Sequence, residues 1–418
     1  MDPIRNPYAP GAGQRPPELA GRGRELDVFD VVLERVARGR PERSLMLTGL
    51  RGVGKTVLLN TLRSQAISRL WGTGKIEARP DQSLRRPVAA ALHMAVRELA
   101  PRHRAPERID DFLGVLKAFA LRANPAAAGG RGAALRLRDR WQPGIDVPTA
   151  TGRADSGDIE IDLVELFTDA AAVATDVGTG IALFIDEMQD VGTDDVSALC
   201  AACHELSQLG GPLIVVGAGL PHLPAVLSAA KSYSERLFRY QRIDRLDRVA
   251  ADQALTAPAV REQVEYEAKA LDLLYDKSGG YPYFVQAYGK ATWDNAPRSP
   301  ITAADVRMAA PEAEAELAVG FFGSRFERAT PAEREYMRAM ASLAGAADPS
   351  ATARVVDDVD PDAAVPTAEI ARSLGRKPAS LSPARDALIK KGLIYSGERG
   401  TVAFTVPHFG RYLRTQPG

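Results

Sequence analysis

The segment from Gly49 to Thr56 has the residue types and the spacing that bind a chain of phosphates. It reads GLRGVGKT and fits the pattern G-x-x-x-x-G-K-S/T at every position. A short apolar run typical of a buried strand, Ser44 to Thr48, precedes it, and an apolar helical pattern follows from Val57. Glycines let successive backbone N–H groups point at an anion, and the start of the helix adds the positive end of its dipole. The sequence therefore predicts a strand, a phosphate-binding loop and a helix in that order.

The residues of this loop divide the work of binding a nucleoside triphosphate and its Mg²⁺. Lys55 would reach the β- and γ-phosphates, and the Thr56 hydroxyl would hold the metal ion. The candidate nucleotide-binding residues are Gly49, Leu50, Arg51, Gly52, Val53, Gly54, Lys55, Thr56 and Val57. The alternative is a glycine-rich turn that matches by chance, and the strand and helix signals on either side disfavour it.

A pair of carboxylates follows a second apolar run. Ile181 to Ile185 reads IALFI and leads directly into Asp186 and Glu187. A carboxylate at the carboxyl end of a parallel strand can meet the Mg²⁺ held by Thr56, and its neighbour can orient the attacking water. We therefore expect Asp186 to bind the metal ion and Glu187 to act as the catalytic base, beside Lys55. The alternative, a solvated acidic turn after a strand, is disfavoured by the phosphate loop upstream.

Composition limits the remaining classes of function. The 418 residues include 53 Lys and Arg and 53 Asp and Glu, so nucleic-acid binding would have to come from a local patch. No apolar run is long enough to span a membrane, and the first residues lack the apolar core of a signal peptide, so we expect a cytoplasmic protein. Cys200, Cys203 and His204 spell C-x-x-C-H. No second pair of metal ligands accompanies them, and we expect core thiols rather than a haem, redox or zinc site.

These motifs resemble those of the AAA+ ATPases, in particular the archaeal-type or origin-initiator-like group. The run ending in Asp186 and Glu187 looks like a Walker B motif, and Gly21-Arg22-x-x-Glu25-Leu26 is similar to the segment that lies over the adenine. Gly279-Gly280-Tyr281-Pro282 resembles the Gly-Gly-x-Pro start of a lid helix in these ATPases and in the related STAND signalling NTPases. The resemblance implies an α/β fold with a parallel sheet covered by helices on both faces, ATP and Mg²⁺ as ligands, and Arg22 near the base.

The resemblance also directs attention to residues that assist hydrolysis. Arg236, ahead of a short strand expected at Gln241 to Leu246, matches the arginine finger that acts on a neighbouring subunit, and this implies a homo-oligomer. The alternative is a salt-bridged helix end. The strand expected at Pro212 to Val216 leads into Gly217-Ala218-Gly219 and lacks the usual polar sensor. The lid arginine is also missing, with Lys290 as the nearest cation, so we expect slow or partner-stimulated hydrolysis.

The chain divides by pattern into four parts and one insertion. We expect an extended arm over 1–20, an AAA+ P-loop ATPase core over 21–247, a helical lid over 248–325 and a winged helix-turn-helix domain over 326–418. The Arg-bearing insertion runs from about 101 to 157, with Arg131, Arg136, Arg138, Arg140 and Trp141. Arginines beside an aromatic residue suit nucleic-acid contacts. A flexible insertion with a short β-ribbon is the favoured alternative.

The last fifty residues carry the winged-helix resemblance. A helix from Thr367, a helix from Ser382 to Lys391, and strands at Leu393–Tyr395 and Val402–Val406 follow in the order of that domain. The candidate contacts with double-stranded DNA are Arg376, Lys377, Ser382, Arg385, Lys390, Lys391 and Arg399. Positions 331–418 nevertheless hold 12 Lys or Arg against 10 Asp or Glu, which is barely basic.

The sequence thus leads to one main hypothesis and two rivals. The main hypothesis is an ATP-binding and ATP-hydrolysing AAA+ protein that couples nucleotide state to DNA binding or remodelling. The first rival is a STAND-like switch that binds protein partners instead of DNA. The second is a transposition-type adaptor ATPase that forms filaments on DNA.

Overall fold

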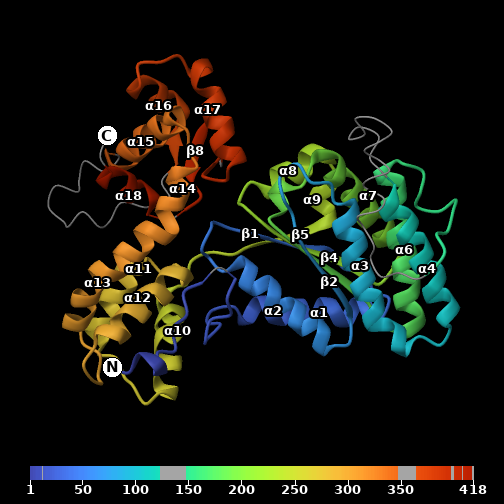
Figure 1. Ribbon diagram of the computed structural model, residues 1–418, viewed down its shortest axis with the longest axis horizontal. Coiled ribbons are helices and arrows are strands. Elements are labelled where there is room, and N and C mark those ends of the chain that lie inside the picture. The colour runs from blue at the N-terminus through green and yellow to red at the C-terminus, as the bar shows by residue number, and fades with distance from the viewer. Residues whose placement is uncertain (12, 123–146, 347–363, 397–399, 407, 417–418) are drawn as a thin grey trace.

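The computed structural model describes residues 1–11, 13–122, 147–346, 364–396, 400–406 and 408–416 (Figure 1). The arginines and the tryptophan singled out in the insertion, and Arg399 of the C-terminal candidates, lie outside these residues. Within the described residues no helix has the length and apolar character needed to cross a membrane.

A five-stranded parallel sheet in the order β2-β3-β4-β1-β5 forms the centre of the first half of the chain. The strands are β1 (Ser44–Thr48), β2 (Gly72–Glu77), β3 (Ile181–Asp186), β4 (Leu213–Gly219) and β5 (Phe238–Arg242). Thr48 at the end of β1 lies opposite Gly219, and Glu77 lies opposite Asp186. Because all carboxyl ends share one edge, the phosphate loop after β1 and the carboxylates after β3 meet there. The expected α/β fold class is confirmed.

Helices cover both faces of this sheet. They are α1 (Gly23–Ala37), α2 (Lys55–Ser68), α3 (Arg85–Leu99), α4 (Pro106–Leu121), α6 (Ile159–Val177), α7 (Thr193–Leu209), α8 (Leu223–Ala230) and α9 (Ser234–Leu237). Alternate strand residues point to opposite sides, so Leu45 and Leu47 pack with α1 and α2 whereas Met46 packs with α3, α6 and α7. Figure 1 shows α1 and α2 on one side of the sheet and α3, α4 and α6 on the other.

Two features of the sheet differ from the sequence predictions. Strand β2 was not predicted, because its sequence GTGKIE contains two glycines that suggest a loop. The glycines are required by close packing of α3, since a Cβ at Gly74 would lie 2.4 Å from the Ala91 carbonyl oxygen. The last strand, β5, spans Phe238–Arg242 rather than Gln241 to Leu246, because Phe238 is the buried anchor and pairs with Ser44.

Helices α10 (Arg248–Arg261), α11 (Ala268–Ser278), α12 (Pro282–Asn295) and α13 (Ala303–Leu317) form a separate bundle, called the lid below. Gly279 caps α11 in the left-handed conformation, and Pro282 begins α12, as the Gly-Gly-x-Pro pattern predicts. A Cβ on Gly280 would lie 2.3 Å from the Leu246 carbonyl oxygen, so this glycine lets the lid approach the end of the core.

The N-terminal arm runs along the lid, as Figure 1 shows for the blue end of the chain. After a short 3₁₀ turn at Pro3–Arg5, Tyr8 is almost fully buried, and its hydroxyl donates a hydrogen bond to the Leu255 carbonyl oxygen (2.7 Å). The Asn6 amide donates to the Asp294 carboxylate at 2.7 Å. These contacts hold the arm against the lid.

The C-terminal domain comprises α15 (Pro331–Ala346), β6 (Val365–Pro366), α16 (Thr367–Ser373), α17 (Pro378–Lys390), β7 (Ile394–Tyr395), β8 (Thr401–Phe404) and α18 (Phe409–Thr415). Its antiparallel strands lie in the order β6-β8-β7. Helices α15, α16 and α17 precede the antiparallel pair β7 and β8, and the winged-helix assignment stays a prediction. Helix α17 starts four residues before the predicted Ser382 and contains Pro383.

Stacked aromatic rings join the lid to the C-terminal domain. The connection is a π-helical segment, η5 (Ala318–Gly323), followed by α14 (Ser324–Glu327). Phe321 stacks on Tyr283 of the lid at 4.8 Å between ring centroids, and its neighbour Phe322 stacks on Tyr412 of α18 at 5.2 Å. Large buried rings contribute strongly to packing, so the lid and the C-terminal domain are firmly connected.

Candidate functional site

The phosphate loop adopts the shape that its glycines predict. Gly52 and Gly54 have φ angles of 84° and 89°, in the region that only glycine adopts readily, and Lys55 begins α2. A Cβ on Gly49 would lie 2.2 Å from the Ile243 carbonyl oxygen, so the start of the loop has no room for a side chain. The loop therefore places backbone N–H groups at the start of a long helix, and this arrangement favours the binding of an anion.

Lys55 lies inside the loop and forms no ion pair with a carboxylate of the described residues. Its Nζ donates to the carbonyl oxygens of Gly49 (2.9 Å) and Leu50 (2.8 Å). Burial lowers the pKa of Lys55 to about 8, although the nearby Glu187 and Asp186 carboxylates act in the opposite direction. A partly buried ammonium group bonded only to carbonyl oxygens would gain strongly from a phosphate.

Thr56 and Asp186 are in contact, as the motifs require. The Thr56 hydroxyl lies beside the Asp186 carboxylate, and the Glu187 N–H donates to Asp186 Oδ1 at 3.0 Å. Burial raises the pKa of Asp186, and the nearby Thr56 hydroxyl opposes that rise. A hydroxyl and a carboxylate are hard oxygen ligands that suit Mg²⁺, so these residues fit the metal ion.

The Glu187 carboxylate is held from two sides. Its backbone is left-handed, with φ of 53°, and its oxygens lie 3.5 Å from Arg51 Nη1 and 2.5 Å from Gln189 Nε2. Gln189 also accepts a hydrogen bond from the N–H of Leu220 (3.1 Å), just after β4. Gln189 thus places a polar group between Glu187 and the end of β4, beside Gly217-Ala218-Gly219. Sequence reasoning missed Gln189, although its position two residues after Glu187 was a usable signal.

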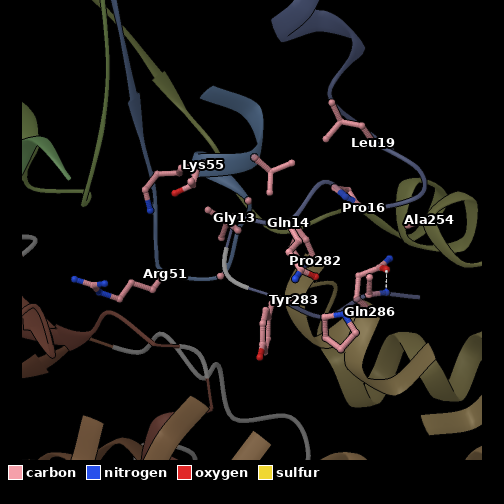
Figure 2. A pocket seen from close by; sticks show the side chains of 18 of the residues that line it. Gly13, Gln14, Pro16, Leu19, Arg51, Lys55, Ala254, Pro282, Tyr283 and Gln286 are labelled. Carbon is pink, nitrogen blue, oxygen red and sulfur yellow. Dashed lines mark hydrogen bonds between the residues drawn. The ribbon is translucent and has the colours of Figure 1, made fainter. Parts of the chain in front are cut away.

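A cavity opens above the loop between the arm, the core and the lid. It is lined by Lys55, Thr56, Asp186 and Glu187 from the core, by arm residues from Ala9 to Arg22, and by lid residues that include Pro282, Tyr283 and Gln286. Figure 2 shows Gly13 and Gln14 of the arm beside Pro282 and Gln286. The arm's share of the cavity was not predicted, since only Arg22 was assigned to the nucleotide.

Arg22 lies at the rim where the arm enters the core. Its side chain is buried, and its Nη2 donates to the carbonyl oxygens of Val53 (3.1 Å) and Asp244 (2.6 Å). Burial lowers the pKa of Arg22. Arg22 therefore lines the cavity and ties the phosphate loop to the segment after β5.

A cation that was not predicted, Arg325, reaches the cavity from α14. Its guanidinium lies 4.3 Å from the centroid of Phe321 and donates to the Phe321 carbonyl oxygen. Burial and the nearby Arg51 lower the pKa of Arg325 to about 10, so it stays charged at neutral pH. Lys290, the nearest cation expected from the sequence, instead pairs with Asp294 and Glu316. No local pattern marks Arg325, because the fold of η5 brings it there.

Arg236 lies away from this cavity. It is exposed on α9, directly before β5, and makes no ion pair with any of the described residues. An arginine in that place could act only on a nucleotide bound by another subunit.

Most of the basic candidates for DNA contact are already paired with acids. Arg376 pairs with Glu335 (3.2 Å), Lys390 with Asp81 (3.5 Å), Lys391 with the buried Glu333 (2.6 Å), and Arg385 with Asp386 (2.9 Å). Lys377 is exposed at the start of α17, and the Ser382 hydroxyl donates weakly to the Pro378 carbonyl oxygen (3.5 Å). The part of α17 that remains available for DNA contact is therefore its N-terminal end.

The two cysteines are buried, free thiols on α7, as predicted. Burial raises the pKa of Cys200 to about 12 and that of Cys203 further. Thiols in this state are unreactive.

Comparison with known proteins agrees with this geometry. Residues 18–216 match the AAA ATPase domain, and residues 319–413 match a domain of unknown function (DUF8462). No curated protein matches the sequence.

Several solved structures are similar to the chain. The Walker-type ATPase PABY2304 of Pyrococcus abyssi has 14% identity over 96% of this chain and 97% of that chain, with a TM-score of 0.55. The Holliday junction branch migration motor RuvB of Thermotoga maritima has 16% identity over 97% and 100%, with a TM-score of 0.42. ORC1 of Aeropyrum pernix, in complex with DNA, has 14% identity over 98% and 95%, with a TM-score of 0.41. The similarity to PABY2304 supports the fold, and the match to the AAA ATPase domain covers residues 18–216 of the chain.

Proposed function

We propose that this ATPase couples the state of its nucleotide to double-stranded DNA binding or remodelling through the C-terminal domain. In this proposal Lys55 binds the β- and γ-phosphates, and Glu187 orients the water that attacks the γ-phosphate. Thr56 and Asp186 hold Mg²⁺, which neutralises charge on the phosphate oxygens. The observation that carries the catalytic part is the contact of the Thr56 hydroxyl with Asp186 beside the half-buried Lys55.

The position of the cavity supports the coupling. A nucleotide held by the core also touches Tyr283 of the lid and Arg325 of α14, since both line the same cavity. Phe321 and Phe322 link these residues to α18 by stacked rings. A ligand that binds one arrangement of core and lid more tightly shifts the population toward it, and the C-terminal domain then moves with the lid.

The DNA part is supported by the free end of α17. Recognition helices contact base edges with their N-terminal residues, and Lys377 and Ser380 are exposed at that end. Hydrolysis would also require a second subunit if Arg236 acts in trans, because it does not line its own cavity. We propose a homo-oligomer on that ground.

The second candidate function is a switch that binds protein partners. One observation favours it: four of the five described basic candidates are neutralised by carboxylates of the same chain. Lys391 in particular holds the buried Glu333 and is thereby part of the domain's structure.

Duplex DNA separates the two functions. We expect duplex DNA to accelerate ATP turnover. We also expect Lys377→Glu to weaken duplex binding about tenfold and to reduce the slope of log affinity against log salt concentration by about one. The control is Lys269→Glu, a charge reversal at an exposed lysine of α11. Binding is measured by fluorescence anisotropy at several salt concentrations. Equal binding by both variants, with no acceleration of turnover, would favour the protein-binding switch.

Arg325 provides a test of the lid side of the cavity. We expect Arg325→Ala to weaken ATP binding about tenfold, because one charge-assisted contact with phosphate is lost. AMP binding should change less, since AMP lacks the β- and γ-phosphates. Lys290→Ala is the control, and titration calorimetry with both nucleotides gives the affinities. An equal loss for ATP and AMP would show that Arg325 supports the cavity without binding phosphate.

A further inference from the structure

The C-terminal domain contacts the phosphate loop at Arg51. The Arg51 backbone N–H donates to the Thr405 carbonyl oxygen at 2.9 Å, and its Nε donates to the Gly392 carbonyl oxygen at 3.3 Å. The same guanidinium lies 3.5 Å from Glu187. Figure 2 shows the Arg51 side chain extending away from the arm and lid residues. One side chain thus contacts the Glu187 carboxylate and the C-terminal domain at once.

The two acceptor carbonyls belong to a rigid part of the C-terminal domain. Thr405 is fully buried, and its hydroxyl donates to the Gly392 carbonyl oxygen at 2.6 Å. Its N–H donates to the Leu393 carbonyl oxygen at 3.1 Å. Gly392 has a φ of 63°, which suits the sharp turn after α17. Docking therefore presents two fixed carbonyl oxygens to Arg51.

This contact with the core is polar, in contrast to the aromatic connection with the lid. A second contact of the same kind joins Lys390 to Asp81 at 3.5 Å, and both of these side chains are largely exposed. Exposed ion pairs contribute little to stability, whereas the stacked rings at Phe321 and Phe322 are buried. Separation of the C-terminal domain from the core is therefore easier than its separation from the lid.

We propose that Arg51 is a positioning residue that makes the rate of hydrolysis depend on docking of the C-terminal domain. In the docked arrangement, Arg51 and Gln189 occupy the two carboxylate oxygens of Glu187. Those oxygens must accept a hydrogen bond from water for the attack to be oriented. When the domain leaves, the Gly392 and Thr405 carbonyl oxygens no longer fix Arg51 beside Glu187, so the Arg51 side chain can move away and leave the carboxylate free to accept from water. The inference rests on the role proposed above for Glu187.

Steady-state ATP turnover of Arg51 variants tests this device. We expect Arg51→Ala to raise kcat about fivefold, because the variant lacks the partly exposed ion pair that restrains Glu187. Arg51→Lys keeps the charge without the planar fork and should give an intermediate kcat. The control is Arg69→Ala, which removes an arginine paired with Asp30 and Glu34 on the far end of α2. A folded Arg51→Ala protein with the kcat of the wild type, or a lower one, would overturn the proposal.

A cross-link tests the same device without changing the loop. The double variant Asp81→Cys/Lys390→Cys is joined by a cleavable bismaleimide. Cys200 and Cys203 are buried and do not react with this reagent. We expect turnover to fall several-fold on joining and to recover on cleavage, because joining holds the docked arrangement. Unchanged turnover of the joined protein would overturn the proposal.

The Glu187→Gln variant separates failure of the device from failure of the proposed function. If the wild-type protein hydrolyses ATP through Glu187 and the Arg51 variants match it, only the positioning role of Arg51 is wrong. If Glu187→Gln hydrolyses ATP as fast as the wild type, the proposed role of Glu187 is itself wrong.

Discussion

Replacement of Lys55 by alanine is expected to weaken ATP binding about 100-fold. The ammonium group lies within the loop, and its bonds to Gly49 and Leu50 place it where the phosphates would lie. Removing one partner of a poorly solvated charge contact costs roughly 3 kcal/mol, and each 1.4 kcal/mol is about a factor of ten in affinity. Titration calorimetry measures the loss directly.

The matched control for this change is Lys75→Ala. Lys75 is an exposed lysine on β2 whose Nζ donates to Asn60 Oδ1 at 2.6 Å, outside the cavity. Its removal should leave ATP binding unchanged. Thermal unfolding of both variants checks that the fold is intact. If a folded Lys55→Ala protein bound ATP with the affinity of the wild type, the assignment of the phosphate loop to the nucleotide site would be wrong.

Replacement of Glu187 by glutamine is expected to lower ATP turnover about 100-fold or more while ATP binding stays within about threefold. A positioned general base contributes about two to four orders of magnitude to a rate, and an amide cannot accept the proton. Binding persists because Lys55 and the backbone groups of the loop are unchanged. Phosphate release and calorimetry on the same protein separate the two effects.

Glu77→Gln is the control for the loss of a carboxylate at this edge of the sheet. Glu77 ends β2 and lies opposite Asp186 in the strand pairing, but its side chain is exposed. We expect wild-type turnover from this variant. Equal slowing by both substitutions would indicate a general effect of charge rather than a specific role for Glu187.

Local patterns predicted the parts of the site that lie close together in sequence. The loop from Gly49 to Thr56 and the carboxylates at 186 and 187 each follow a strand, and one strand, one turn and one helix decide their shape. The Gly279-Gly280-x-Pro282 lid start is equally local, and the structure places all of these as expected. The domain limits proposed near 247 and 325, and the roles of the site residues, stay predictions.

Contacts between distant segments were not predictable in this way. Strand β2 has glycines because α3 passes close to it. From strand propensity alone, those glycines predict a loop instead. Arg325 and the arm reach the cavity only through the packing of η5 and of Tyr8 on the lid. Lys391 looked available to DNA until its partner Glu333, 58 residues away, was located. In each case the deciding partner comes from another element.

The stacked rings around Phe321 and Phe322 have a mechanical consequence. Since they fasten the lid to the C-terminal domain, we expect the two to turn together, as one long lever, about the segment that joins the lid to the core. A small rotation at the nucleotide becomes a larger sweep at the tip of α17, in proportion to its distance from the pivot. The amplitude of that stroke depends on the stiffness of a few aromatic side chains and would decrease if any of them were replaced by a small residue.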